Sequence, residues 1–135
     1  MKFNIRLLNE SDYDNTLVKW WKDWRWTAPP KDALPNNGTG GFMVSKDGVD
    51  ICAGFAYFTN STIAYCEFIV SNFEYKEKDR KEAIELLITY ICEACKEAGY
   101  KSVWTCLVNK GLIDKYEHCG FSKLTTNCTE MIKIL

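Results

Sequence analysis

The chain has 135 residues, 47% of them apolar and 26% charged, with a formal net charge of −1. This composition is typical of one soluble globular domain, which we expect to span residues 1–135. The near-neutral charge argues against nucleic-acid binding. No apolar run reaches the roughly 20 residues that a membrane span needs, and no signal-peptide pattern opens the sequence, so we expect a cytoplasmic protein without a membrane partner.

Seven cysteines are distributed along the chain. An odd number without a secretion signal indicates reduced thiols that serve as small apolar side chains. Cys92 and Cys95 have the spacing of a metal or redox pair, but they lie within a helical pattern, and no second pair follows at the spacing of a zinc site. We therefore expect no metal centre.

The first third of the chain predicts a strand, a helix and a loop. Phe3–Leu7 alternates apolar and polar residues as a half-buried strand does. Ser11 and Asp14 have the spacing of a capping box, so we expect a helix of about a dozen residues that ends before Pro29. Residues 27–41, rich in Pro, Gly and Asn, then form a loop long enough to be functional. The helix has a largely aromatic stripe of Tyr13, Leu17, Trp20, Trp21 and Trp24.

Three strands are predicted in the middle of the chain. Gly41–Ser45 and Val49–Thr59 are separated by a hairpin-type turn, and Ile63–Val70 follows. The last of these is almost continuously apolar, which indicates a strand buried on both faces. Glu67 is the one carboxylate that interrupts it.

A long helix and a strand come next. An apolar stripe predicts the helix from about Arg80 to Ala98, with Asp79 as its N-cap and Gly99 as its C-cap. Ser102–Val108 has the pattern of a strand. Because a helix between two strands forms a right-handed crossover, this strand should be the parallel neighbour of Ile63–Val70.

The C-terminal part adds a short helix, from Asn109 to Gly120, and one or two last strands within Phe121–Leu135. The complete order of elements is β-α-β-β-β-α-β-α-β. It predicts an α/β (α+β) domain with a mixed sheet.

The segment around the short helix resembles the final motif of the GNAT acyltransferases. It has an Asn at position 109, a Tyr seven residues later at position 116, and Gly120-Phe121 at the start of the last strand. Gly99-Tyr100, at the end of the long helix, is also similar. The resemblance covers nearly the whole chain in element order, and it implies a GNAT-like mixed sheet of six to seven strands with three to four helices, whose central strands splay apart.

The resemblance also implies acetyl-coenzyme A as the cosubstrate. In that family the Asn and the Tyr lie beside the coenzyme A thiol, and the Tyr often protonates the departing thiolate, which carries over to Asn109 and Tyr116. The backbone of Phe68, Ile69 and Val70 would pair with the pantetheine arm like an added strand. The alternative for Tyr116 is that it serves only as the apolar anchor of an amphipathic helix.

The segment before the long helix departs from the family pattern. In the family, a Gly-rich turn holds the pyrophosphate through backbone N–H groups. Here no small residue stands in the turn, and an aspartate places negative charge at the helix N-terminus. Four cations could hold the pyrophosphate through side chains instead, or the run is a solvated helix start. The candidate cofactor-binding residues of this segment are Lys76, Lys78, Asp79, Arg80 and Lys81.

Glu67 is the candidate general base, because the family commonly uses a Glu on or near this strand, directly or through water. Burial would raise its pKa towards the working range. The alternative is a Glu that faces outward from the sheet. Acyl transfer to an amine also needs a proton donor for the sulfur leaving group, which Tyr116 can supply.

Four tryptophans lie within seven positions, from Trp20 to Trp26. In the family, the first helix and the loop after it border the acceptor site, so Trp24 and Trp26 are the candidate substrate-binding residues. The alternative is that the aromatic stripe packs into the core. His118 is the only histidine, and no nucleophile motif accompanies it, which argues against a hydrolase.

The sequence therefore predicts an N-acyltransferase that moves an acetyl group from acetyl-coenzyme A to the primary amine of a small molecule or peptide. A homodimer is compatible with this prediction. The alternative is a catalytically silent GNAT-like domain that binds a protein or a ligand. The acceptor stays open, because a fold does not fix a substrate.

Overall fold

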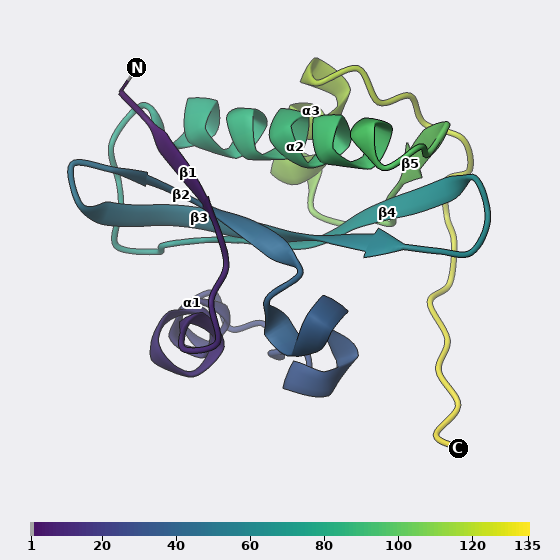
Figure 1. The fold of residues 1–135 in the computed structure, drawn as a ribbon, viewed down its shortest axis with the longest axis horizontal. Coiled ribbons are helices and arrows are strands. Elements are labelled where there is room, and N and C mark those ends of the chain that lie inside the picture. Colours follow the sequence, from purple (N-terminus) through teal and green to yellow (C-terminus); the bar gives the residue numbers. More distant parts are fainter. Residues whose placement is uncertain (1) are drawn as a thin grey trace.

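A computed structural model describes residues 2–135 and shows a twisted sheet with helices on both faces (Figure 1). Two helices, α2 and α3, cover one face of the sheet, and α1 lies on the other. The elements in chain order are β1 (Asn4–Leu7), a π-helical turn (Tyr13–Leu17), α1 (Val18–Asp23), two 3-10 helices (Lys31–Ala33 and Pro35–Gly38), β2 (Gly41–Lys46), β3 (Val49–Phe58), β4 (Ile63–Ser71), α2 (Arg80–Glu97), β5 (Ser102–Trp104) and α3 (Lys110–His118).

The sheet has the strand order β1-β2-β3-β4-β5. The first four strands pair antiparallel, and β4 pairs parallel with β5, which confirms the predicted crossover through α2. The predicted mixed sheet is therefore present, with three α-helices. The prediction of six to seven strands is wrong, since residues 2–135 form five.

The difference in strand number lies in the C-terminal segment. Residues 122–135, all of them described, form no strand, and the chain leaves the body of the protein in an extended path (Figure 1). The apolar residues that suggested a strand are exposed to solvent. Apolar residues can fit the surface of a sheet, but a strand forms only where a neighbour completes its hydrogen bonds. These exposed residues are Leu124, Met131, Ile132, Ile134 and Leu135.

The predicted capping box at the first helix is also wrong. Ser11 donates two hydrogen bonds, from its backbone N–H and its hydroxyl, to the side-chain oxygen of Asn9, and no side chain caps the helix start. Asp12 instead accepts two hydrogen bonds from the guanidinium of Arg6 on β1, at 2.8 and 2.9 Å. This bidentate pair joins the helix start to the edge of the sheet, a contact that helix-start rules do not consider.

The core is divided by the sheet into two apolar clusters. One lies between the sheet and α2, and Tyr116 of α3 packs into it. The other lies between the sheet and α1, and it contains the buried Trp20 and Trp21. Successive side chains of a strand point to opposite faces, so neighbouring residues of β4 belong to different clusters.

All seven cysteines are free thiols, as the sequence predicted, but only three of them are fully buried. Within residues 2–135, no group of His, Cys, Asp and Glu side chains has the arrangement of a metal site. None of the described helices combines the length and the hydrophobicity needed to cross a bilayer.

Candidate functional site

The two parallel strands, β4 and the edge strand β5, separate soon after they meet. The pairing of β4 with β5 covers Ile63–Tyr65 and Ser102–Trp104, and within the described chain no ladder joins residues 66–71 to residues 105–109. β4 and β5 therefore part beyond Tyr65, although the prediction placed the splay between central strands and β5 lies at the edge of the sheet.

The same stretch of β4 is irregular on its other side. Its register with β3 shifts between Ala53 and Phe55, and Phe68 has a φ of 57°. A bulge and a non-glycine residue in the left-handed region are costly, and such features concentrate at functional positions. The backbone of Phe68, Ile69 and Val70, predicted to meet the pantetheine, lies along this irregular and unpaired stretch.

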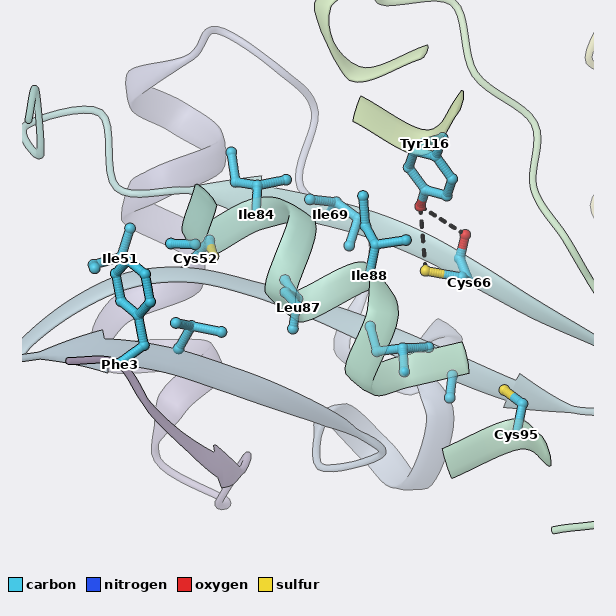
Figure 2. Packing of buried hydrophobic residues seen from close by; sticks show 14 of the residues in the cluster. Phe3, Ile51, Cys52, Cys66, Ile69, Ile84, Leu87, Ile88, Cys95 and Tyr116 are labelled. Atoms are coloured by element: carbon cyan, nitrogen blue, oxygen red, sulfur yellow. Dashed lines mark hydrogen bonds between the residues drawn. The ribbon is translucent and has the colours of Figure 1, made fainter. Parts of the chain in front are cut away.

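Tyr116 of α3 reaches the point where the strands separate. Its hydroxyl donates to the backbone carbonyl of Cys66 at 3.1 Å and lies 3.2 Å from the Cys66 sulfur (Figure 2). Cys66 directly follows the last residue of β4 that pairs with β5. The phenol of Tyr116 therefore stands at the inner end of the opening.

The ring of Tyr116 is deeply buried, with 2% of its surface exposed. It packs edge-on against Phe121, with ring centroids 4.9 Å apart. Burial raises the pKa of Tyr116 above its ordinary value, and the neighbouring Cys66 adds to the shift. The phenol therefore stays protonated at neutral pH, the form that a proton donor needs.

Glu67 lies on the opposite side of β4 from Cys66, because consecutive side chains alternate. Its carboxylate accepts a hydrogen bond from the hydroxyl of Thr105 at 2.9 Å and another from the backbone N–H of Cys106. Desolvation raises the pKa of Glu67, and these two hydrogen bonds partly oppose the shift. The carboxylate thus spans the opening between β4 and the chain after β5.

Thr105 is a site residue that sequence reasoning missed. It follows β5 directly and affects the pKa of both Glu67 and Tyr116 through hydrogen bonding. A threonine within a strand-like run carries no chemical signal of its own. Only the parallel pairing of the two strands could have placed it opposite Glu67.

Asn109 serves as the N-cap of α3. Its side-chain oxygen accepts a hydrogen bond from the backbone N–H of Leu112 at 2.9 Å. This is the usual role of an Asn before a helix, and it fixes the start of the helix that carries Tyr116. Its predicted position beside the coenzyme A thiol remains a prediction.

The N-terminus of α2 differs from the prediction in one respect. Asp79 stands at the N-cap position, but its carboxylate does not cap the helix. It accepts hydrogen bonds from Lys46 and from the hydroxyl of Tyr75, each at 2.7 Å. The bond with Lys46, followed by that with Tyr75, holds the pKa of Asp79 below its ordinary value. The negative charge is thus paired with a cation from β2.

The cations of residues 76–81 contact different groups. The Lys76 ammonium lies over the ring of Phe73, 5.5 Å from its centroid. The Arg80 guanidinium lies over Trp24 and donates to the Tyr75 carbonyl at 3.2 Å. Lys78, like Asp79, lines a hollow of about 560 Å³ beside the turn between β2 and β3, whereas Lys81 is an exposed residue in the first turn of α2. The predicted four-cation clamp therefore remains a prediction.

The two candidate substrate tryptophans form a stacked pair. The rings of Trp24 and Trp26 lie 5.5 Å apart, and the Trp24 indole donates to the Ser71 carbonyl at 2.8 Å. This places the pair at the C-terminal end of β4. Trp20 and Trp21 are core residues, whereas Trp26 is 41% exposed. The middle of the aromatic stripe is thus core, its last member Trp24 is half-buried, and Trp26, which lies outside the stripe, is exposed.

His118, the only histidine, is exposed on α3, and its Nδ1 lies 3.0 Å from a carboxylate oxygen of Glu85.

No family model matches this chain, and no curated protein matches it in sequence.

Solved structures with the same fold are nevertheless found. Glucosamine-6-phosphate N-acetyltransferase from Arabidopsis thaliana superimposes with a TM-score of 0.67 at 14% identity, over 98% of this chain and all of that protein. A GNAT family acetyltransferase from Staphylococcus aureus gives a TM-score of 0.63 at 17% identity, over 98% of this chain and all of that protein.

A third similar structure is N-acetylglutamate synthase from Neisseria gonorrhoeae, complexed with coenzyme A and L-arginine. It gives a TM-score of 0.74 at 12% identity, over 96% of this chain but only 30% of that protein. At these identities the comparisons concern the fold.

Proposed function

We propose that this chain, which has the fold of the GNAT acetyltransferases, transfers an acetyl group from acetyl-coenzyme A to a primary amine. One observation carries the proposal. A protonated phenol and a partly buried carboxylate flank the point where two parallel strands separate. Acyl transfer to an amine needs a proton donor and a proton acceptor at one reacting centre.

The reaction assigns one role to each group. The amine nitrogen attacks the thioester carbonyl carbon, a C–N bond forms and the C–S bond breaks. Glu67 takes the proton that the amine loses, directly or through water. Tyr116 gives its proton to the departing sulfur, and its raised pKa ensures that it has a proton to give.

The unpaired stretch of β4 fits an extended substrate arm. Its backbone polar groups from residue 66 onward lack a ladder partner on the β5 side within the described chain. An extended chain with amide groups can satisfy them as an added strand would. We assign this role to the backbone of Phe68, Ile69 and Val70.

The phosphates of coenzyme A are assigned to the cations at the start of α2, which are Lys76, Lys78, Arg80 and Lys81. Asp79, in the same segment, is paired with Lys46 and so does not repel the phosphates with a free charge.

Titration calorimetry with acetyl-coenzyme A, followed by a thiol-release assay with an amine panel, tests this function. We expect micromolar binding, about −8 kcal/mol, and amine-dependent release of the free thiol. Absence of binding at millimolar acetyl-coenzyme A would contradict the proposal.

A catalytically silent module is the second candidate, and one specific observation favours it. The Tyr116 hydroxyl already has a protein partner, the carbonyl of Cys66, and its ring is enclosed. A phenol that never leaves this carbonyl would act as a structural anchor. Binding of acetyl-coenzyme A without any acetyl transfer, in wild type and in Tyr116→Phe alike, would support this second function.

A further inference from the structure

An aromatic row crosses the sheet on its α1 side. Tyr57 of β3 is the register partner of Tyr65 on β4, and Tyr65 is the register partner of Trp104 on β5. Register partners lie about 5 Å apart and point to the same face of a sheet. The three rings therefore form a continuous row over three neighbouring strands.

This row is open to solvent at its β5 end. Tyr65 is 37% exposed and Trp104 is 41% exposed. Trp24, which follows α1, reaches β4 only at its far end, where its indole donates to the Ser71 carbonyl. Tyr57 anchors the other end, because its hydroxyl donates to the Ala33 carbonyl at 2.8 Å. Phe68 adds a fourth ring, whose centroid lies 6.2 Å from that of Tyr57.

The carboxylate of Glu67 lies directly beside this row. Glu67 is two residues beyond Tyr65 on the same strand, so both side chains point to the same face. Its hydrogen bonds come from the neutral Thr105 and Cys106, and it forms no salt bridge within residues 2–135. Glu130 is the charged side chain close enough to act on it, and that charge is also negative.

We propose that this row is the acceptor-binding surface, and that the acceptor is a primary ammonium carried on a flat apolar group, such as an arylalkylamine. The inference rests on the proposed acetyl transfer and specifies its substrate class. Phosphorylated or carboxylated amines are disfavoured, because their anionic groups would lie near the carboxylates of Glu67 and Glu130. Among the residues that the structure describes, no cation acts on the pKa of Glu67 to offset this repulsion.

Two physical effects favour such an acceptor. Aromatic faces attract both a flat apolar group and a cation. The approaching ammonium is also attracted to the ionised Glu67. The carboxylate that attracts the ammonium is the same group that would take its proton, so binding and activation occur at one place.

A matched set of amines tests the substrate class. We expect kcat/KM for 2-phenylethylamine to exceed that for glucosamine 6-phosphate and for glutamate by about 100-fold, the discrimination that charge and shape can provide together. Equal rates, or a preference for an anionic amine, would overturn the inference while leaving the acetyl transfer itself intact.

Substitutions locate the acceptor. Trp104→Leu and Tyr65→Leu should each raise the KM for 2-phenylethylamine about tenfold and leave the KM for acetyl-coenzyme A unchanged. Tyr90→Leu is the matched control, because Tyr90 is 44% exposed but lies on α2 against Phe42. Unchanged amine KM values in both row variants would overturn the inference.

A direct binding experiment decides the case even if no amine is acetylated. The protein is titrated with 2-phenylethylamine, and binding is monitored by the NMR shift of the Trp104 indole. The affinity should be about tenfold higher than that for the neutral 2-phenylethanol. Failure of both compounds to move this signal overturns the inference. So does sedimentation showing that the row is buried between two copies of the chain.

Discussion

The two faces of β4 place adjacent residues in opposite environments. On the α2 side, Cys66 and Tyr116 form a dry contact within the larger apolar cluster. On the α1 side, Glu67 lies half-buried beside exposed aromatic rings and keeps two hydrogen-bond donors. One strand thus separates an enclosed proton donor from an accessible proton acceptor.

Under the proposed function, this difference lets one strand serve both ends of a proton transfer. Full burial disfavours the charged phenolate, so Tyr116 keeps its proton. Partial burial raises the pKa of Glu67 but leaves the ionised form stabilised by Thr105 and Cys106. The alternation of side chains along a strand separates two environments that would otherwise conflict.

The largest expected effect comes from the enclosed side. Tyr116→Phe removes the proton donor and should lower kcat about 1,000-fold, within the range for general acid catalysis. It also removes a buried hydrogen bond, at about 1 kcal/mol of unfolding free energy. Steady-state kinetics and urea unfolding measure the two effects.

Tyr100→Phe is the matched control for that variant. The Tyr100 hydroxyl also donates to a backbone carbonyl, that of Thr59, but it lies away from the opening. We expect a similar loss of stability and no loss of activity. An equal loss of kcat in both variants would show that Tyr116 acts only on stability.

On the accessible side, Glu67→Gln should lower kcat about 100-fold at pH 8. In wild type, activity should rise with pH as Glu67 loses its proton, with a midpoint above the ordinary carboxyl pKa of 4.5. This rising limb should be absent from the variant. Glu82→Gln, at an exposed position on α2, is the control, and a limb that persists in Glu67→Gln would remove this carboxylate from the mechanism.

Stability provides a second readout for Glu67→Gln. The folded-state pKa of Glu67 is raised, so its contribution to stability is present at low pH and is lost as pH rises through that pKa. At pH 8 the variant should therefore be no less stable than wild type. A lower Tm of the variant at pH 8 would contradict the assigned environment.

A smaller effect is expected at the residue opposite Glu67. Thr105→Val removes a hydrogen bond that lowers the pKa of Glu67, so the rising limb of the pH profile should move to higher pH. The rate well above that limb should change only a few-fold. Thr62→Val, at an exposed position before β4, should leave the profile in place. A shift to lower pH would reverse the assigned role of Thr105.

The smallest effect concerns the α2 side of β4, where Cys66 is buried in the apolar cluster. Cys66 is buried, and desolvation raises the pKa of its thiol, so it should resist alkylation by iodoacetamide in the native protein. The exposed Cys106 and Cys128 should react. Peptide mass spectrometry compares the three positions, and equal modification of Cys66 would show that the α2 side opens to solvent.

Local sequence rules identified most of the elements and their order. The apolar stripe of residues 80–98 predicted α2, the Lys46–Gly48 turn predicted the β2–β3 hairpin, and the crossover rule predicted the parallel pairing of β4 and β5. These features depend on interactions within a few residues or on chain handedness. They are therefore readable without knowledge of the packing.

The same rules failed where a partner distant in sequence decides the outcome. The apolar residues of Phe121–Leu135 predicted one or two strands, but no neighbour in the described part of the chain pairs with this segment. The capping function expected of Asp79 was replaced by a bond to Lys46, the last residue of β2. Side chains with several possible partners are placed by tertiary contacts.

The fold class and the two candidate catalytic groups could be read from the amino-acid sequence, because periodicity and the motif around Asn109 and Tyr116 are local properties. How those groups lie relative to each other depends on tertiary contacts. The separation of β4 and β5, the placement of Thr105 against Glu67 and the row from Tyr57 to Trp104 all depend on strand register. Register is set by contacts between residues far apart in the chain, so no short segment specifies it alone.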